Sequence, residues 1–216
     1  MDRPPPARPS WGRQVAQALG CWFLDTGIMY RAVTWLALEQ GVSPDDSAGL
    51  SHLTKAVKVL PVSMNGNSVE VSGRRVGPEL REPRIDGNVS NVSRHPVVRR
   101  AMVEQQWAYA ESVLERGGIV MIGRDIGTVV LPTAELKVYL TASAKERARR
   151  RCRDILEKGQ PANLASVQSD IEARDAIDSS RDDSPLRPAK DAWQFDTTGL
   201  TIDQAVNAVL RRAEEQ

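Results

Sequence analysis

Short, mostly apolar segments recur along the chain, as is typical of strands covered on both faces of a sheet. They lie at residues 21–24, 119–122, 136–140 and 193–196, and segments with helical periodicity separate them. Strands that alternate with helices predict an α/β fold with a doubly wound parallel sheet. We expect ligand-binding residues just beyond the carboxyl ends of these strands.

The helical patterns have recognisable ends. Gly20, Gly41 and Gly117 each follow an amphipathic run, as is common after the last turn of a helix. Residues 42–56 indicate a loop and a short helix. The other predicted helices cover residues 11–19, 28–40, 92–116 (with Pro96 near its start), 143–157, 164–177 and 201–212.

In residues 57–76 the spacing of the apolar residues changes to alternation. Valines alternate with polar residues, and Asn65-Gly66 and Ser72-Gly73 supply turns, which indicates small antiparallel strands. We interpret this segment as an insert that continues to about Asn91. The expected division is a core of residues 1–56 and 92–150, the β insert at 57–91, a helical lid region at 151–183, and a last strand and helix at 184–216.

Composition excludes several classes of function. The net charge of +1 implies no general attraction to nucleic acid or to an acidic membrane. No apolar run approaches the roughly 18 residues of a transmembrane helix, and residues 1–10 lack the apolar region of a secretory signal. Cys21 and Cys152 form neither a disulfide framework nor a metal-binding pattern. We therefore expect a reduced, cytoplasmic protein.

Polar turns follow two of the predicted strands. The segment Gly123-Arg124-Asp125-Ile126-Gly127 offers a guanidinium fork for a phosphate and a carboxylate acceptor for amino or hydroxyl groups. Thr26 and Arg31 follow the strand at 21–24. The alternatives are a structural ion pair in the first turn and a solvated helix arginine at Arg31.

Arginines are also dense in two predicted helices. The first contains Arg147, Arg149, Arg150, Arg151 and Arg153, which is either a solvated, salt-bridged face or a phosphate-facing one. In the second, Arg174, Asp178 and Arg181 share one face, which favours either a local ion pair or a mobile lid that carries guanidinium groups to a polyphosphate.

Several long motifs, in this order, resemble those of the bacterial cytidylate kinases, which are P-loop nucleoside monophosphate kinases. The resemblance covers roughly residues 16–210. The motifs are LDTGIMYRAVT (24–34), VGPELREPRI (76–85), VSNVSRHPVVR (89–99), GRDIGTVVLPTAELKVYLTASAKERARRR (123–151), RDAIDSSRDDSPLRPAKDA (174–192) and DTTGLTIDQAV (196–206). The insert at 57–91 distinguishes this family from adenylate, guanylate and shikimate kinases.

The resemblance implies roles for individual residues. Arg31, Arg124, Arg174 and Arg181 would surround the CMP phosphate and the transferred phosphoryl group, with Arg124, Arg174 and Arg181 as the catalytic residues. Thr26 would help to place the monophosphate, and Asp178 would hold the sugar hydroxyls. Ser90, Arg99 and Asp125 would read the cytosine edge. Arg147 and Arg151 would contact the donor nucleotide.

The activity implied is transfer of a phosphoryl group from ATP to CMP or dCMP, with Mg²⁺. Positioned guanidinium groups and Mg²⁺ can catalyse this reaction without a covalent intermediate. The implied partner is a small-molecule substrate and the implied state a monomer.

The beginning of the chain departs from this family. The phosphate loop GxxxxGK[ST] and its preceding strand are not recognisable; Arg8 stands at the lysine position, and Pro4, Pro5 and Pro6 occupy part of the loop. Proline lacks the amide hydrogen that cradles a phosphate. We favour a truncated or frame-shifted start over a real loss of ATP binding. Two other hypotheses stay open: a non-catalytic CMP-binding remnant, and a segment of a larger gene product.

Overall fold

The computed structural model describes residues 11–63, 66–157, 159–180 and 184–215, without the side chains of residues 62–67. Its first half contains α1 (Trp11–Leu19), β1 (Trp22–Asp25), α2 (Gly27–Glu39), α3 (Ser47–Thr54), β2 (Val57–Ser63), β3 (Gly66–Val71), β4 (Arg74–Val76), the 3₁₀ turn η1 (Pro78–Arg81), α4 (Pro83–Ser93) and α5 (Pro96–Leu114). Its second half contains β5 (Ile119–Ile122), the π-helical turn η2 (Ile126–Val130), β6 (Val138–Thr141), α6 (Ala144–Glu157), α7 (Leu164–Ser179), β7 (Trp193–Asp196) and α8 (Ile202–Glu214).

Parallel strand pairs confirm the α/β class expected from the sequence. β1 pairs with β5, from Trp22 opposite Ile119 to Asp25 opposite Ile122. β6 pairs with β7, and β2, β3 and β4 form a separate antiparallel sheet, as the alternation of valines predicted. Among the described strands, no hydrogen-bonded ladder joins the two parallel pairs. They therefore form two short sheets.

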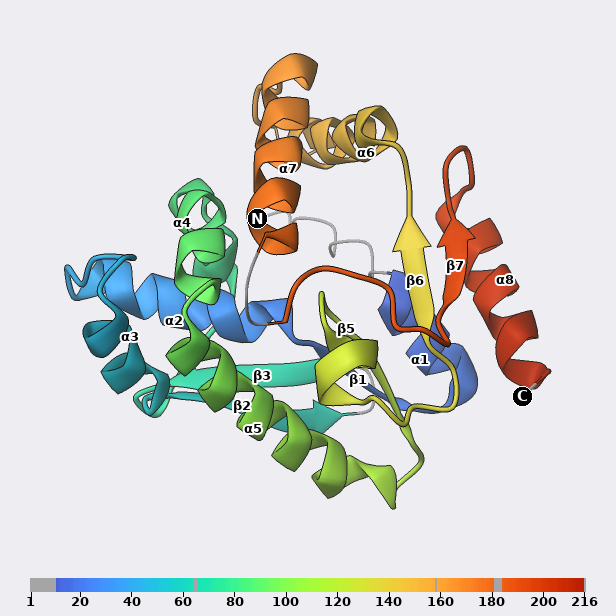
Figure 1. Cartoon of the computed structure of the whole chain (residues 1–216), viewed down its shortest axis with the longest axis horizontal. Coiled ribbons are helices and arrows are strands. Elements are labelled where there is room, and N and C mark those ends of the chain that lie inside the picture. Colours follow the sequence, from blue (N-terminus) through green and yellow to red (C-terminus); the bar gives the residue numbers. More distant parts are fainter. Residues whose placement is uncertain (1–10, 64–65, 158, 181–183, 216) are drawn as a thin grey trace, which may run out of the picture.

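Helices connect these short sheets. In Figure 1 the β6–β7 pair lies beside α1 and α8, whereas β1 and β5 lie close to the antiparallel strands β2 and β3. α1 contacts β1, β5 and α8, and its Val15 packs with Val206 and Val209 of α8. The main core lies on the other side of β1, where α2, α3, α5 and the antiparallel sheet bury their apolar side chains.

The long helix predicted at 92–116 is present as α5, but it begins at Pro96 rather than at Val92, and a further helix that was not predicted, α4, precedes it. Residues 83–93 form α4, which ends before Pro96, and α5 begins at that proline. Pro96 disfavours helical backbone in the preceding residue, and His95 is accordingly extended. α4 buries Ile85, Val89 and Val92, whose spacing is helical. Gly87 and Asn88, poor helix formers, obscured this pattern.

α6 and α7 form a helical hairpin that stands above the rest of the molecule in Figure 1. Gly159, in the connection, has a φ of +73°, a conformation that residues with a Cβ rarely adopt. The hairpin brings the arginine-rich helix predicted at 143–157 close to α7, and α7 also contacts α4. The basic side chains of α6 can therefore approach residues of the body.

Candidate functional site

The carboxyl ends of β1 and β5 are locked together by Thr26. Its backbone amide and its hydroxyl both donate to the carbonyl of Ile122, each at 3.0 Å. Gly123 follows, and a Cβ there would collide with the Thr26 hydroxyl oxygen and lie 2.8 Å from Ile126 Cδ1. Only glycine fits this close approach, so the turn that carries Arg124 and Asp125 has a fixed position beside the end of β1.

Arg124 extends from this turn toward two aspartates of α7. Its Nε lies 3.2 Å from Asp178 Oδ2, and its Nη1 lies 3.6 Å from Asp175 Oδ1. Asp175 also accepts a hydrogen bond of 2.5 Å from Arg147 of α6. The carboxylates of α7 therefore hold arginines from a strand end and from the neighbouring helix close together.

Arg174 lies on the same face of α7 as Asp178, as its spacing predicted. Its Nε is 4.0 Å from Asp178 Oδ2, and this nitrogen is buried with no hydrogen bond to the described residues. The pKa of Arg174 is lowered, first by burial and then by the positive charge of Arg124, although Asp178 opposes this shift. An anion placed here would relieve an unfavourable concentration of positive charge.

Arg31 and Arg151 meet at a third aspartate. Asp86, in the first turn of α4, accepts from Arg31 Nη2 through one oxygen and from Arg151 Nη2 through the other, both at 2.5 Å. Arg31 also donates to the carbonyl of Leu80 at 3.0 Å. An arginine of α2 in the body and one of α6 in the hairpin thus share a single carboxylate.

Arg99 and Asp125 form a separate pair in the interior. Arg99 Nη2 donates to Asp125 Oδ2, and Arg99 Nη1 donates to the carbonyl of Ser93 at 3.3 Å. The guanidinium also lies 5.6 Å from the centroid of the Tyr30 ring. Ser90 is buried in α4, and its carbonyl accepts from the hydroxyl of Ser93. Arg99 and Asp125, both predicted to read the cytosine edge, are therefore in direct contact.

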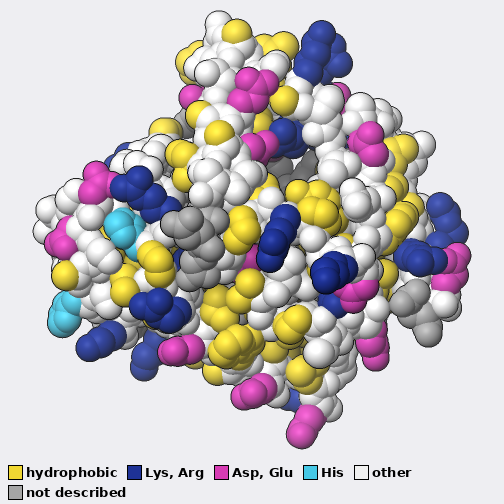
Figure 2. Space-filling view, in the orientation of Figure 1, with side chains coloured by type: hydrophobic (Ala, Val, Ile, Leu, Met, Phe, Trp, Pro, Cys, Tyr) yellow, Lys and Arg dark blue, Asp and Glu magenta, His cyan; other side chains and the backbone are white. Residues whose placement is uncertain are grey.

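Charge within the cluster is unbalanced among the described residues. Five guanidinium groups (Arg31, Arg124, Arg147, Arg151 and Arg174) face three carboxylates (Asp86, Asp175 and Asp178). The predicted site residue Arg181 lies outside the described residues. On the face in Figure 2, by contrast, basic and acidic side chains are interspersed. The excess of positive charge at the cluster suits a multiply charged anion such as a phosphate.

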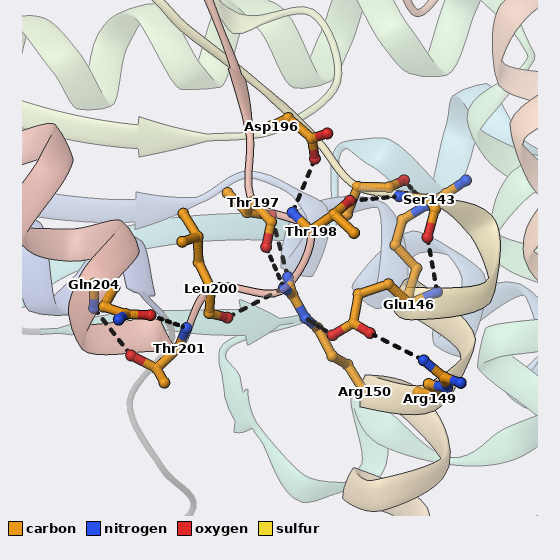
Figure 3. A network of polar contacts seen from close by, with 12 residues as sticks. Ser143, Glu146, Arg149, Arg150, Asp196, Thr197, Thr198, Leu200, Thr201 and Gln204 are labelled. Carbon is orange, nitrogen blue, oxygen red and sulfur yellow. Dashed lines mark hydrogen bonds and ion pairs between the residues drawn. The ribbon is translucent and has the colours of Figure 1, made fainter.

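Not every arginine of α6 belongs to this cluster. Arg150 donates to the carbonyls of Thr197 (2.6 Å) and Leu200 (3.4 Å), and it also bonds to Glu146 and to the hydroxyl of Thr197 (Figure 3). These contacts join α6 to the loop after β7. Arg149 is exposed, and its one ion pair among the described residues is with Glu146, at 3.9 Å. The salt-bridged alternative for the arginine run is therefore correct for these two residues.

Three acidic residues near the site were not predicted from the sequence. Asp86 and Asp175 hold four of the arginines, and nothing in the local sequence distinguished them. Asp25 did carry a signal, because it ends β1 directly. The pKa of its carboxyl is raised, because burial outweighs the hydrogen bond from the Gly27 amide and the charge of Arg81.

Three further observations concern surface pockets, metal-binding groups and membrane-spanning helices among the described residues. Two surface pockets, of about 270 and 340 Å³, are lined by residues outside the predicted site. In the described part of the chain, no group of three or more His, Cys, Asp or Glu side chains is arranged to hold a metal ion. None of the described helices has the length and apolarity needed to cross a membrane.

Known proteins share this sequence over nearly its whole length. The family profile described as cytidylate kinase matches residues 6–215. A cytidylate kinase from Exiguobacterium sibiricum is 46% identical over 203 residues, which cover 94% of this chain and 89% of that protein. A cytidylate kinase from Geobacillus sp. is 42% identical over 203 residues, with the same shares.

A second kind of relative is longer. A bifunctional pantoate ligase/cytidylate kinase from Parasynechococcus marenigrum is 42% identical over 203 residues, which cover 93% of this chain but only 40% of that protein. This chain therefore spans less than half of the bifunctional relative and most of the two shorter ones. Because the profile match and the alignments cover more than nine-tenths of the sequence, the chain belongs to the cytidylate kinase family.

Proposed function

We propose that this chain transfers the γ-phosphoryl group of ATP to CMP or dCMP and so forms CDP or dCDP. Membership of the family implies a nucleotide as phosphate donor. The observation that carries the proposal is the cluster of five arginines from α2, α6, α7 and the turn after β5. Phosphoryl transfer depends on such positioned positive charge, because the transition state spreads negative charge over the phosphoryl oxygens.

The phosphate and the sugar of the acceptor nucleotide, CMP, would be held at the arginine cluster. Arg31, Arg124 and Arg174, with Arg181, would bind the CMP phosphate, helped by Thr26 at the ends of the strands. Asp178 would accept hydrogen bonds from the sugar hydroxyls. This assignment is supported by the excess of guanidinium groups over carboxylates at the cluster, which leaves positive charge to attract a phosphate.

The base would bind beside the buried pair. Cytosine offers an exocyclic amine as donor and a ring nitrogen and carbonyl as acceptors. Asp125 suits the amine, whereas Arg99 and Ser90 suit the acceptors. The contact between Arg99 and Asp125 supports this assignment, because an already paired donor and acceptor need little reorganisation to meet the complementary edge of a base.

Fewer residues are assigned to the binding of ATP, the phosphate donor. Arg147 and Arg151, one turn apart on α6, would contact the phosphates of ATP. The described residues hold no carboxylate cluster for Mg²⁺, and the hydroxyl of a GxxxxGK[ST] loop is not recognisable in the sequence. The described residues therefore form no ligand set for a metal held by the protein, and no step of the reaction is assigned here to Mg²⁺.

We also propose that the described residues lack the first central strand of the family fold and that the α6–α7 hairpin acts as a lid. The separation of the β1–β5 and β6–β7 pairs supports an absent strand between them. The sharing of Asp86 and Asp175 between body and hairpin arginines supports a lid that lies over the cluster. A variant of the chain that gains an apolar strand and a GxxxxGKS loop should then show higher kinase activity.

Calorimetric titration with CMP and, separately, with Mg·ATP tests the function. Saturable binding of both, with ADP formation that depends on CMP or dCMP and is weaker with AMP or GMP, is the expected result. Binding of CMP without ATP would favour the non-catalytic alternative and would place the defect on the donor side. Absence of CMP binding would overturn the proposal.

The remaining expectations concern the state of the protein. We propose a monomer that acts in the cytoplasm on a small-molecule substrate, without nucleic acid or membrane as partner. The mixed surface charge in Figure 2 and the small net charge support this description. Sedimentation analysis would test the monomer, and a concentration-dependent increase in mass would contradict it.

A further inference from the structure

Asp86 occupies an unusual position for a carboxylate. Its two oxygens each accept a hydrogen bond of 2.5 Å from a different arginine, Arg31 of α2 and Arg151 of α6. The side chains of Arg31 and Asp86 are largely buried, with exposed fractions of 22% and 26%. The Arg31–Asp86 pair is therefore less hydrated than surface salt bridges, which contribute little, whereas Arg151 of the second pair is 43% exposed.

This arrangement matches the way proteins bind a phosphate. A phosphoryl group presents several oxygens to guanidinium groups from separate segments, and a carboxylate presents two. Arg31 is proposed to bind the acceptor phosphate and Arg151 the donor phosphates. Asp86 thus lies between the two arginines that would face the two sides of the transfer.

The same contact links the hairpin to the body. Arg147 lies one turn before Arg151 on α6, and it is held by Asp175 of α7, inside the hairpin. The bond from Arg151, by contrast, crosses to α4. The negative charge of Asp86 also opposes, as the smallest of the contributions, the lowering of the pKa of Arg174.

We propose that Asp86 is a positioning residue whose carboxylate holds the place of a substrate phosphoryl group between Arg31 and Arg151 and is displaced when a phosphate binds. The inference rests on the proposed function for the identity of that phosphate. A phosphoryl group carries more negative charge than a carboxylate and offers more acceptor oxygens, so it can replace Asp86 at both guanidinium groups.

Replacement of Asp86 by Asn tests the inference, because the amide keeps the shape but removes the competing charge. We expect D86N to bind CMP about tenfold more tightly than the unchanged chain, with cytidine binding unaltered, since cytidine lacks the phosphate. The affinity for inorganic phosphate should rise by the same factor in D86N. Asp45→Asn is the matched control, because it removes the same charge from an exposed pair with Arg94 and should change none of these affinities.

The outcomes separate the two proposals. If D86N bound inorganic phosphate more tightly than the unchanged chain but neither protein bound CMP, the proposed function would be overturned and the inference would stand. CMP binding to both proteins without a gain in D86N, or with a loss, would overturn the inference, because Asp86 would then assist the phosphate site. An equal increase in the affinity of D86N for CMP and for cytidine would also overturn the inference, because cytidine has no phosphate.

A measurement on the unchanged chain makes the test independent of how D86N folds. In nuclear magnetic resonance spectra of isotope-labelled arginine, phosphate should shift the guanidinium signals of Arg31 and Arg151. The signal of Arg84, which is paired with Glu39 and Glu82 and not with a carboxylate of the cluster, should not move. Unshifted Arg31 and Arg151 signals at saturating phosphate would overturn the inference.

Discussion

Arg99 and Asp125 form an ion pair in which both side chains are almost completely buried, with exposed fractions of 3% and 4%. Arg99 belongs to α5, whereas Asp125 follows β5, so the pair connects the long helix to the strand end that carries the candidate site. Removing one partner of a buried pair is costly, because it leaves the remaining charge uncompensated in a medium of low dielectric constant.

Replacement of Asp125 by Asn should therefore lower the free energy of unfolding by about 3–5 kcal/mol, as measured by urea denaturation. The free energy of unfolding should fall less in the double variant Arg99→Leu/Asp125→Leu than in D125N, because the double variant buries no uncompensated charge. A loss below about 1 kcal/mol in D125N would mean that water or another group compensates Arg99.

Replacement of Arg124 or Arg174 by Ala should weaken CMP binding at least about tenfold, because each removes charge-assisted hydrogen bonds to the phosphate. The affinity for cytidine should change much less. Calorimetry measures both affinities, and Arg84→Ala, which removes an exposed arginine outside the cluster, is the control. Unchanged CMP affinity, together with unchanged kcat/KM, in both variants would refute their assignment.

Arg150 and Arg149 are neighbours on α6 with different expected roles. Arg150→Ala removes hydrogen bonds to Glu146, Thr197 and Leu200 and should lower the free energy of unfolding by about 1–3 kcal/mol. Arg149→Ala should change it by less than about 0.5 kcal/mol, because Arg149 is exposed. Denaturant titrations compare the two variants. A loss below about 0.5 kcal/mol in Arg150→Ala as well would show that the hydrogen bonds of Arg150 in Figure 3 contribute little.

Tyr109 gives a prediction for alkaline pH. Burial raises the pKa of its phenol to about 12, from an ordinary value of 10.0. Because the folded state keeps the proton more tightly, this stabilisation is complete below about pH 10 and is lost as pH rises toward 12. The free energy of unfolding of Tyr109→Phe should therefore fall less steeply over this interval.

The control for this prediction is the comparison at neutral pH. There the variant should be less stable by about 1 kcal/mol, because Tyr109 donates a hydrogen bond to the carbonyl of Phe23. Stability curves that stay parallel up to pH 12 would contradict a raised pKa for this phenol.

Much of the secondary structure was predictable because it depends on local patterns. The helices at 11–19 and 164–177 and the antiparallel strands after residue 57 follow the periodicity of apolar residues, and the strand at 119–122 follows from a short continuous apolar run. α4 was not predicted, because the helical spacing of Ile85, Val89 and Val92 is interrupted by weak helix formers, and the start of the long helix was placed at residue 92 instead of at Pro96.

The α/β class, the family and the arginines that are candidates for the site all follow from the sequence alone, because periodicity and motif spacing are local properties. Which of these arginines meet, and through which acids, depends on the tertiary structure. Asp86 bridges arginines of α2 and α6, Asp175 bridges an arginine of the turn after β5 and one of α6, and Arg150 joins α6 to the loop after β7. The physical reason is that an ion pair depends on distance in space, and the packing of α4, α6 and α7 sets those distances.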